Sequence, residues 1–293
     1  MSFNHHDGDE VVHYYGHHDN YKIIENPHCA ECNATVVYFS SNGIYFPNTY
    51  EEFHSTIKNK DRYEWSKFEN QFPFAKKMIF LRDIHKQWYL KGINKEINSF
   101  EKIAEFIKKH HASEKLILVG TSSGGFVATI VGMLLKADAV FSFAGQFTLE
   151  NYLREGKDKL VVDLYDQNKI YYNLEPLLNK SSTDIFYFVC KHSKIDQDDI
   201  SIASKYQNIH TFCFDCDIHG VPFHSTLLKK ILSTKKENLI VLSKKNNGQL
   251  LKPSLFWKQL FNRNEYIITY SLFVMKNLKK IPRYVLKKIK GHQ

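Results

Sequence analysis

One stretch of the sequence decides the fold: Leu116-Ile117-Leu118-Val119-Gly120-Thr121-Ser122-Ser123-Gly124-Gly125. An apolar, β-branched run leads directly into a Gly-x-Ser-x-Gly turn, and Gly124 to Lys136 is then apolar on nearly every side. The first run predicts a buried strand and the last segment a buried helix. We therefore expect a tight strand–turn–helix unit with Ser122 at its tip.

The two outer glycines of the turn fit this interpretation. Side chains at Gly120 and Gly124 would collide with neighbouring backbone in so tight a turn, and the serine hydroxyl then projects above the sheet. The first amides of the following helix face the same point, so the N–H of Ser123 is a candidate oxyanion donor. A phosphate-binding loop is the alternative for a Gly/Ser-rich turn, but this stretch contains no lysine.

Further short runs rich in β-branched and aromatic residues predict strands on both sides of this unit. With Lys115–Val119 itself, they are Glu10–Tyr15, Tyr21–Ile24, Thr35–Ser40, Lys77–Leu81, Ala139–Phe143, Asp184–Cys190 and Ile209–Phe214. Glu96–His110 repeats apolar residues at three- and four-residue steps, as a surface helix does. The alternation predicts a doubly wound α/β domain with a mostly parallel sheet of about eight strands, the first two forming an antiparallel pair.

A serine nucleophile at the end of a strand needs an acid and a base later in the chain, in that order. Asp196 lies in the loop after the predicted strand Asp184–Cys190 and is our candidate acid. Asp198 is the second choice, since Asp198 and Asp199 are also placed to cap the helix that follows.

The candidate base lies in the loop after the last predicted strand, Ile209–Phe214. His219 is followed there by glycine, whereas its competitor His224 stands at the start of the helix Ser225–Leu232. We expect His219 to be the base.

Taken together, Gly120–Gly124, Asp196 and His219 resemble the α/β-hydrolase superfamily over roughly residues 8 to 233. The resemblance implies an oxyanion loop after an early strand, where Phe39-Ser40-Ser41-Asn42-Gly43 is found. Asn42 or Gly43 would then supply the second N–H. The His-Gly-Gly-Gly version of lipases is absent.

A looser resemblance is to hydrolase-like proteins of bacterial surface-polysaccharide loci. It is carried by Arg82-Asp83, Trp88-Tyr89 and His219–Phe223. Arg82 and Asp83 are placed to bind a polar substrate or to pin a loop as an ion pair. Trp88 and Tyr89 are placed to stack on a sugar ring or to belong to the core.

The activity implied is hydrolysis of an acyl ester through an acyl-enzyme, on a small molecule or an acylated glycan. An O-acetyltransferase that modifies a surface polysaccharide would use the same residues. A non-catalytic, membrane-associated binding module is the alternative of another class. No cofactor is implied. Cys29/Cys32 and Cys213/Cys216 have the C-x-x-C spacing of zinc ligands. We nevertheless expect no zinc, because the second pair falls largely in a strand, where its two side chains point to opposite faces.

The C-terminal part differs in charge from the rest. Residues 235–293 contain 14 Lys and Arg against 2 Asp and Glu. We divide the chain into a hydrolase domain (1–235), a linker (236–252) and a basic amphipathic helical tail (253–293), in which 265–290 separates lysines from apolar residues and Pro282 interrupts the helix. The tail predicts contact with an anionic membrane or, alternatively, packing on the domain; no recognition motif indicates nucleic acid.

The cellular compartment is predicted from signals at the start of the chain and from cysteine usage. No secretion signal opens the sequence, and five scattered cysteines predict reduced thiols. We expect a cytoplasmic protein held at a membrane surface by its tail.

Overall fold

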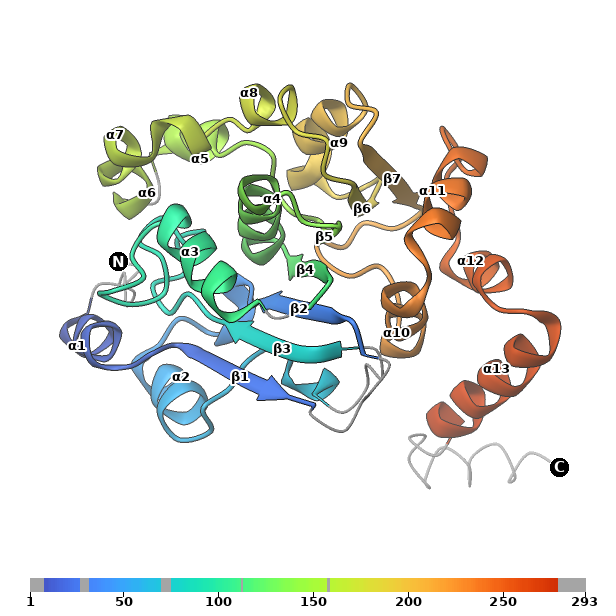
Figure 1. Ribbon diagram of the computed structural model, residues 1–293, viewed down its shortest axis with the longest axis horizontal. Coiled ribbons are helices and arrows are strands. Elements are labelled where there is room, and N and C mark those ends of the chain that lie inside the picture. Colours follow the sequence, from blue (N-terminus) through green and yellow to red (C-terminus); the bar gives the residue numbers. More distant parts are fainter. Residues whose placement is uncertain (1–7, 27–31, 70–74, 112, 157–158, 279–293) are drawn as a thin grey trace, which may run out of the picture.

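The computed structural model describes residues 8–26, 32–69, 75–111, 113–156 and 159–278 (Figure 1). Its centre is a seven-stranded sheet with strand order β1-β3-β2-β4-β5-β6-β7. The strands are β1 (Tyr21–Glu25), β2 (Ala34–Phe39), β3 (Ala75–Leu81), β4 (Lys115–Thr121), β5 (Ala139–Phe143), β6 (Ile185–Cys190) and β7 (Ile209–Phe214).

All neighbouring strands run parallel except β1, which is antiparallel to β3. After β2 the chain adds β3 on one side of it and then crosses to add β4 on the opposite side of β2. The connections that follow β2 and β4 therefore lead in opposite directions along the sheet. Such a switch point leaves a crevice at the carboxyl ends of the strands. Phe39 of β2 is in register with Gly120 of β4, which places the Ser122 turn at that crevice.

Strands β2, β5 and β6 are buried at every position, which explains their continuous apolar runs, whereas the edge strand β1 has no buried residue. On one face alternate residues such as Val37, Leu118 and Tyr187 pack under α3, α4 and α9; on the other, Tyr38, Val119 and Phe188 pack under α10, α11 and α12 (Figure 1). The fold class predicted from the sequence, a doubly wound α/β domain with a mostly parallel sheet, is confirmed.

Helices α2 to α9 lie in the connections between strands, α1 precedes β1, and α10 to α13 follow β7 (Figure 1). The α-helices are α1 (Asp9–His17), α2 (Tyr50–Phe53), α3 (Phe100–His110), α4 (Ser123–Leu135), α5 (Glu150–Glu155), α6 (Lys159–Asp163), α7 (Tyr165–Asn168), α8 (Glu175–Leu178), α9 (Gln197–Ala203), α10 (Ser225–Ser233), α11 (Lys236–Lys245), α12 (Pro253–Leu260) and α13 (Arg263–Leu278). Helix α3 begins later than predicted because Ser99 caps it, accepting the amide of Lys102 at 3.2 Å.

The first predicted strand is wrong. Glu10–Tyr15 lies within α1, where Val11 and Tyr14, three residues apart, form the buried face. The run of valine and tyrosine suggested a strand, but burial at helical spacing against Phe53 and Ile57 decides the structure. The antiparallel partner of β1 is therefore β3, and the described sheet has seven strands instead of about eight.

The predicted linker is also largely structured. Residues 236–245 form α11, whose Leu239 is fully buried. Leu251 then lies beside the outer edge of β7: its N–H donates to the carbonyl of Cys213, and its carbonyl accepts from the amide of Asp215, both at 2.8 Å. This segment therefore pairs with part of the outer edge of β7.

The first helix of the predicted tail packs on the domain. Phe256 and Trp257 of α12 are buried in the same cluster as α10. In α13, Ile267 and Ile268 are 54% and 62% exposed. The remainder of the predicted amphipathic segment, from residue 279, lies outside the described residues. Within the described ranges, no helix combines the length and apolarity needed to span a bilayer.

Candidate active site

Ser122 occupies the sharp turn between β4 and α4, as the sequence predicted. Its backbone angles are φ 53° and ψ −123°, a sparsely populated conformation for a residue with a side chain. The turn is held on both sides, because the amide of Ser122 donates to the carbonyl of Phe143 at 2.9 Å and its carbonyl accepts from the amide of Phe126 at 3.0 Å. The hydroxyl is thereby presented at the carboxyl end of the sheet.

The two predicted elbow glycines stand where no side chain fits. A Cβ on Gly120 would lie 2.0 Å from the carbonyl oxygen of Gly124, and a Cβ on Gly124 would lie 2.4 Å from that of Phe39. The sequence did not single out a further close approach, between Gly125 and Gly145 in the loop after β5. These contacts press the start of α4 against the loops after β2 and β5.

His219 connects Ser122 with Asp196. Its Nε2 lies 2.7 Å from Ser122 Oγ, and its Nδ1 lies 2.8 Å from Asp196 Oδ1. Because a carboxylate only accepts hydrogen bonds, Nδ1 carries the proton and Nε2 accepts from the serine hydroxyl. Asp196 is 0% exposed, whereas the His219 side chain is 25% exposed. This geometry suits removal of the Ser122 proton by an imidazole that a buried carboxylate orients.

The structure separates the two alternatives from Ser122. Asp198 is exposed and accepts from the side-chain amide of Asn151 at 2.5 Å. His224 precedes α10, where its Nδ1 accepts from the amide of Thr226 at 3.3 Å. The hydrogen bonds that join Ser122, the base and the acid are made by His219 and Asp196.

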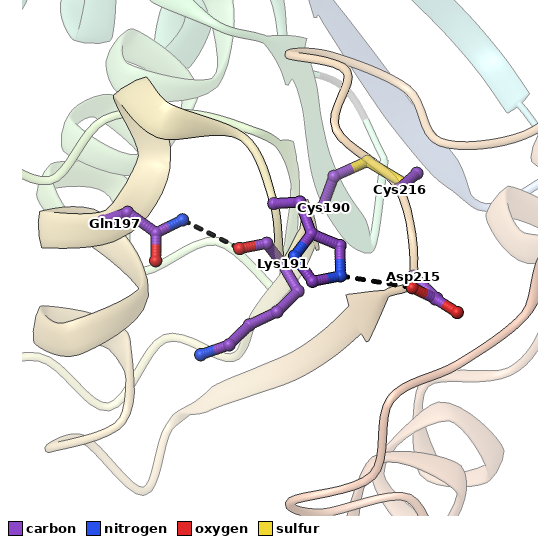
Figure 2. Close-up of a disulfide and its surroundings, with 6 residues drawn as sticks. Cys190, Lys191, Gln197, Asp215 and Cys216 are labelled. Atoms are coloured by element: carbon purple, nitrogen blue, oxygen red, sulfur yellow. Dashed lines mark hydrogen bonds and ion pairs between the residues drawn. A yellow bond between two sulfur atoms is a disulfide. The ribbon is translucent and has the colours of Figure 1, made fainter.

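The loops that carry Asp196 and His219 are joined where they leave the sheet. A disulfide links Cys190, the last residue of β6, to Cys216, two residues after β7 (Figure 2). Beside it the amides of Lys191 and His192 donate to the carbonyls of Phe214 and Cys216 at 2.8 and 2.9 Å. The side chain of Gln197, which follows the acid, donates to the carbonyl of Lys191 at 2.8 Å, as Figure 2 shows.

The disulfide corrects the expectation of reduced thiols. Cys190 and Cys216 are bonded, Cys32 is also in a disulfide, and Cys213 is free. Since disulfides persist mainly in oxidising compartments, cysteine usage does not support the predicted reducing cytoplasm. Cys29 lies outside the described residues.

A second buried carboxyl, that of Asp199, follows Asp196 by three residues. Asp199 accepts the amide of Phe147 at 2.5 Å, and burial raises its pKa to about 7, with the charge of Asp196 adding to the shift. Near neutral pH a substantial fraction of this carboxyl is therefore protonated, and the buried region carries less negative charge than two ionised aspartates would bring.

The predicted oxyanion loop has a different arrangement from the one expected. The amide of Asn42 donates to Ser123 Oγ at 2.9 Å, and the amide of Gly43 donates to Ser41 Oγ at 3.0 Å. The Ser123–Asn42 bond fixes the loop to the start of α4. The amide of Ser41 donates to Glu64 Oε2 at 2.6 Å, a contact that no motif in the sequence indicates.

A pocket of about 410 Å³ opens at Ser122 and His219. Its lining combines polar residues, among them Ser41, Glu64 and Lys67, with apolar ones, among them Val221, Phe223 and Leu228. A larger cavity of about 530 Å³ lies over α9, β7 and the end of α11, and none of the three linked residues lines it. Of these two cavities, the 410 Å³ pocket is the one that Ser122 and His219 line.

The Arg82–Tyr89 segment is structural. Arg82 is buried and pairs with Asp61 at 2.8 Å. Asp83 is buried and accepts the amides of His85, Lys86, Gln87 and Tyr89 at 2.7–3.1 Å. Trp88 and Tyr89 are buried too, which leaves no open face for a sugar ring.

Within the described part of the chain, no group of three or more His, Cys, Asp or Glu side chains is placed to hold a metal ion. The sulfur of Cys216, half of one C-x-x-C pair, is bonded to Cys190.

No family model and no curated protein matches this chain. Solved structures do. The capsule O-acetyltransferase of Neisseria meningitidis serogroup A is 14% identical, over 67% of this chain and 83% of that one, with a TM-score of 0.48. Est1E from Butyrivibrio proteoclasticus is 10% identical over 77% and 94% (TM-score 0.49), and MenH from S. aureus is 12% identical over 78% and 100% (TM-score 0.45). At such distances the chemistry must be argued from this chain's own residues.

Proposed function

We propose that this chain is a serine-dependent acyl-ester hydrolase that works through an acyl-enzyme at Ser122. The observation that carries the proposal is the continuous contact from Ser122 Oγ through His219 to the buried Asp196, at 2.7 and 2.8 Å. A hydroxyl positioned in this way loses its proton to the imidazole as it attacks a carbonyl carbon. The strained turn and the adjoining pocket expose that hydroxyl to a substrate.

In the proposed reaction, Ser122 attacks the ester, and His219 passes the proton to the departing alcohol. The negative oxygen of the tetrahedral intermediate is stabilised by the N–H of Ser123 at the start of α4. Water, activated by His219, then releases the acid. If a sugar hydroxyl replaces water, the same residues catalyse O-acetyl transfer to a glycan, which is the second outcome that the assays must include.

Labelling with a fluorophosphonate tests the proposal. The wild-type protein should form an adduct at Ser122, identified by peptide mass, and Ser122→Ala should not. Ser201→Ala is the matched control, because this exposed serine of α9 lies outside the pocket that contains Ser122; it should label as the wild type does. A folded wild-type protein that neither labels nor releases acetate from 4-nitrophenyl acetate would favour the non-catalytic binding module instead.

For the C-terminal helix we propose attachment to anionic membrane. Two neighbouring isoleucines of α13, Ile267 and Ile268, are exposed, and the sequence that follows is rich in lysine. Each lysine or arginine near an anionic surface contributes about 1 kcal/mol to binding. Such attachment would hold the hydrolase domain beside lipid or membrane-linked glycan esters.

A further inference from the structure

The loop after β2 contains three consecutive backbone amides, those of Ser41, Asn42 and Gly43, and each donates to a side chain of the protein. The amide of Asn42 donates to Ser123 Oγ, and that of Gly43 to Ser41 Oγ. The third, Ser41 N–H, donates to Glu64 Oε2 at 2.6 Å, and both of these residues line the pocket that contains Ser122. Asn42 does not line it.

We propose that the N–H of Ser41 is the second oxyanion donor, and that the carboxylate of Glu64 occupies this donor in the free enzyme as an internal substitute for the substrate's acyl oxygen. The inference rests on the proposed function, since it concerns the same reaction. Glu64 is then an internal competitor for the Ser41 amide, and a substrate must displace it.

The position of Ser41 relative to the nucleophile supports the assignment. Phe39 of β2 is in register with Gly120 of β4, so the two strands end side by side. A Cβ on Gly124 would lie 2.4 Å from the carbonyl of Phe39 and 3.1 Å from that of Ser40, so the loop touches the first turn of α4. Ser41 follows directly and lines the same pocket as Ser122 and His219.

Glu64 is held at this place by its neighbours. Its amide donates to Ser40 Oγ at 3.3 Å, and the indole N–H of Trp65 donates to the carbonyl of Phe39 at 2.9 Å. Trp65 is itself buried against Phe143. The segment that carries the carboxylate is therefore bonded to the same loop that carries the Ser41 amide, and the pair is built into the fold.

The chemical consequence is competition for one donor. A carboxylate oxygen on an N–H reproduces the charge and the hydrogen bond that a tetrahedral oxyanion would make there. When a substrate arrives, Glu64 must release the amide, and its negative charge remains beside the oxygen on which negative charge develops. Both effects slow attack by Ser122, so removing the carboxylate should accelerate acylation.

The test compares the rate of fluorophosphonate labelling at Ser122 in wild type, Glu64→Gln and Glu64→Ala. Both variants should label about tenfold faster, the size expected for release of a hydrogen bond to a charged group. Glu69→Gln is the matched control, because Glu69 belongs to the same segment but pairs with Lys22 at 2.7 Å outside the pocket. It should label at the wild-type rate.

Ser41 allows the donor itself to be removed. Its φ of −83° is compatible with proline, so Ser41→Pro deletes the N–H with little backbone change. This variant should lose about 10²–10³ in the hydrolytic rate constant kcat, and the gain from Glu64→Ala should vanish when the two changes are combined. Ser41→Ala, which keeps the N–H, should lose less.

The outcomes separate this inference from the function on which it rests. If no folded variant, wild type included, labels at Ser122, the proposed function fails. If Ser122 labels but Glu64→Gln and Glu64→Ala react at the wild-type rate or more slowly, with unchanged circular dichroism, only the inference about Glu64 fails. A gain that survives in the Ser41→Pro Glu64→Ala double variant would also overturn it.

Discussion

Asp196 presents one carboxylate oxygen to Nδ1 of His219 at 2.8 Å, while its other oxygen has no hydrogen-bond partner among the described residues. A fully buried carboxylate with a single strong partner is costly to place, and the cost is offset only if that partner donates to it. The contact therefore fixes the orientation of His219 as well as its tautomer.

Asp196→Asn should lower kcat for ester hydrolysis by about 10³–10⁴ while the fold is retained, because the amide no longer holds the proton on Nδ1. Asp198→Asn is the matched control. The Asp198 carboxylate is exposed and contacts Asn151, so kcat of this variant should change by less than about twofold. Equal losses in both variants would contradict the assignment of Asp196 as the orienting acid.

The close packing of the elbow predicts a steric effect. Gly124→Ala places a methyl group 2.4 Å from the carbonyl of Phe39, and Gly120→Ala places one 2.0 Å from that of Gly124. Each should lower the melting temperature and abolish labelling of Ser122. Gly16→Ala, where nothing lies within 4 Å, should instead be neutral or stabilising by up to about 1 kcal/mol within α1. Calorimetry of the three variants checks this.

Loss of the disulfide should affect stability and catalysis together. Cys190→Ser with Cys216→Ser opens a loop of sequence separation 26, which corresponds to about 3 kcal/mol of unfolding free energy. Because the acid and base loops leave the sheet at these two residues, kcat should also fall. Cys213→Ser, which removes the free thiol on β7, serves as the control. A double variant with wild-type denaturation midpoint and kcat would show that the bond has neither role.

The buried carboxyl of Asp199 predicts how stability varies with pH. Its pKa is about 7 in the folded protein and near 3.8 when unfolded, so between these values the folded state holds the extra proton. The unfolding free energy contributed by this group is therefore greatest at low pH and declines as pH rises through about 4 to 7.

Asp199→Asn should remove this decline, because the amide oxygen still accepts from Phe147 and the side chain no longer ionises. The difference in unfolding free energy between pH 5 and pH 8 should be smaller in the variant by a few kcal/mol at most, since one pKa unit corresponds to about 1.4 kcal/mol. Urea denaturation at the two pH values measures it. Parallel pH dependence in both proteins would refute the effect.

Membrane attachment is tested by removing residues 263–293. The cut follows α12, because Phe256 and Trp257 belong to the core and must be kept. Binding to vesicles of phosphatidylserine and phosphatidylcholine should fall sharply and should weaken in the full chain as salt is raised. Vesicle binding that is undiminished after the deletion would exclude the tail as the attachment site.

The elbow could be predicted because its signals are local. A strand, two glycines that admit no Cβ and an apolar helix adjoin one another in the sequence, and the acid and base follow in the loops after β6 and β7. The error at α1 arose because Val11 and Tyr14 favour strands intrinsically, whereas their burial depends on Phe53 and Ile57, far along the chain.

Features that depend on distant pairings could not be found in this way. Cys190 and Cys216 are bonded because β6 and β7 are neighbours in the sheet. Glu64 lies in an irregular segment, and contacts of Glu64 with Ser40 and of Trp65 with Phe39 hold its carboxylate at the Ser41 amide. No spacing or composition rule connects residues 41 and 64.

The pairing of Leu251 with β7 has a consequence for the physical behaviour of the whole molecule. The outer side of β7 is one of the two edges of the sheet, and an uncovered edge offers its amides and carbonyls to another chain. By accepting from Asp215 and donating to Cys213, Leu251 closes part of this edge. The pairing thus removes amides and carbonyls that would otherwise be open to strand-to-strand aggregation. A chain shortened before Leu251 should therefore lose solubility.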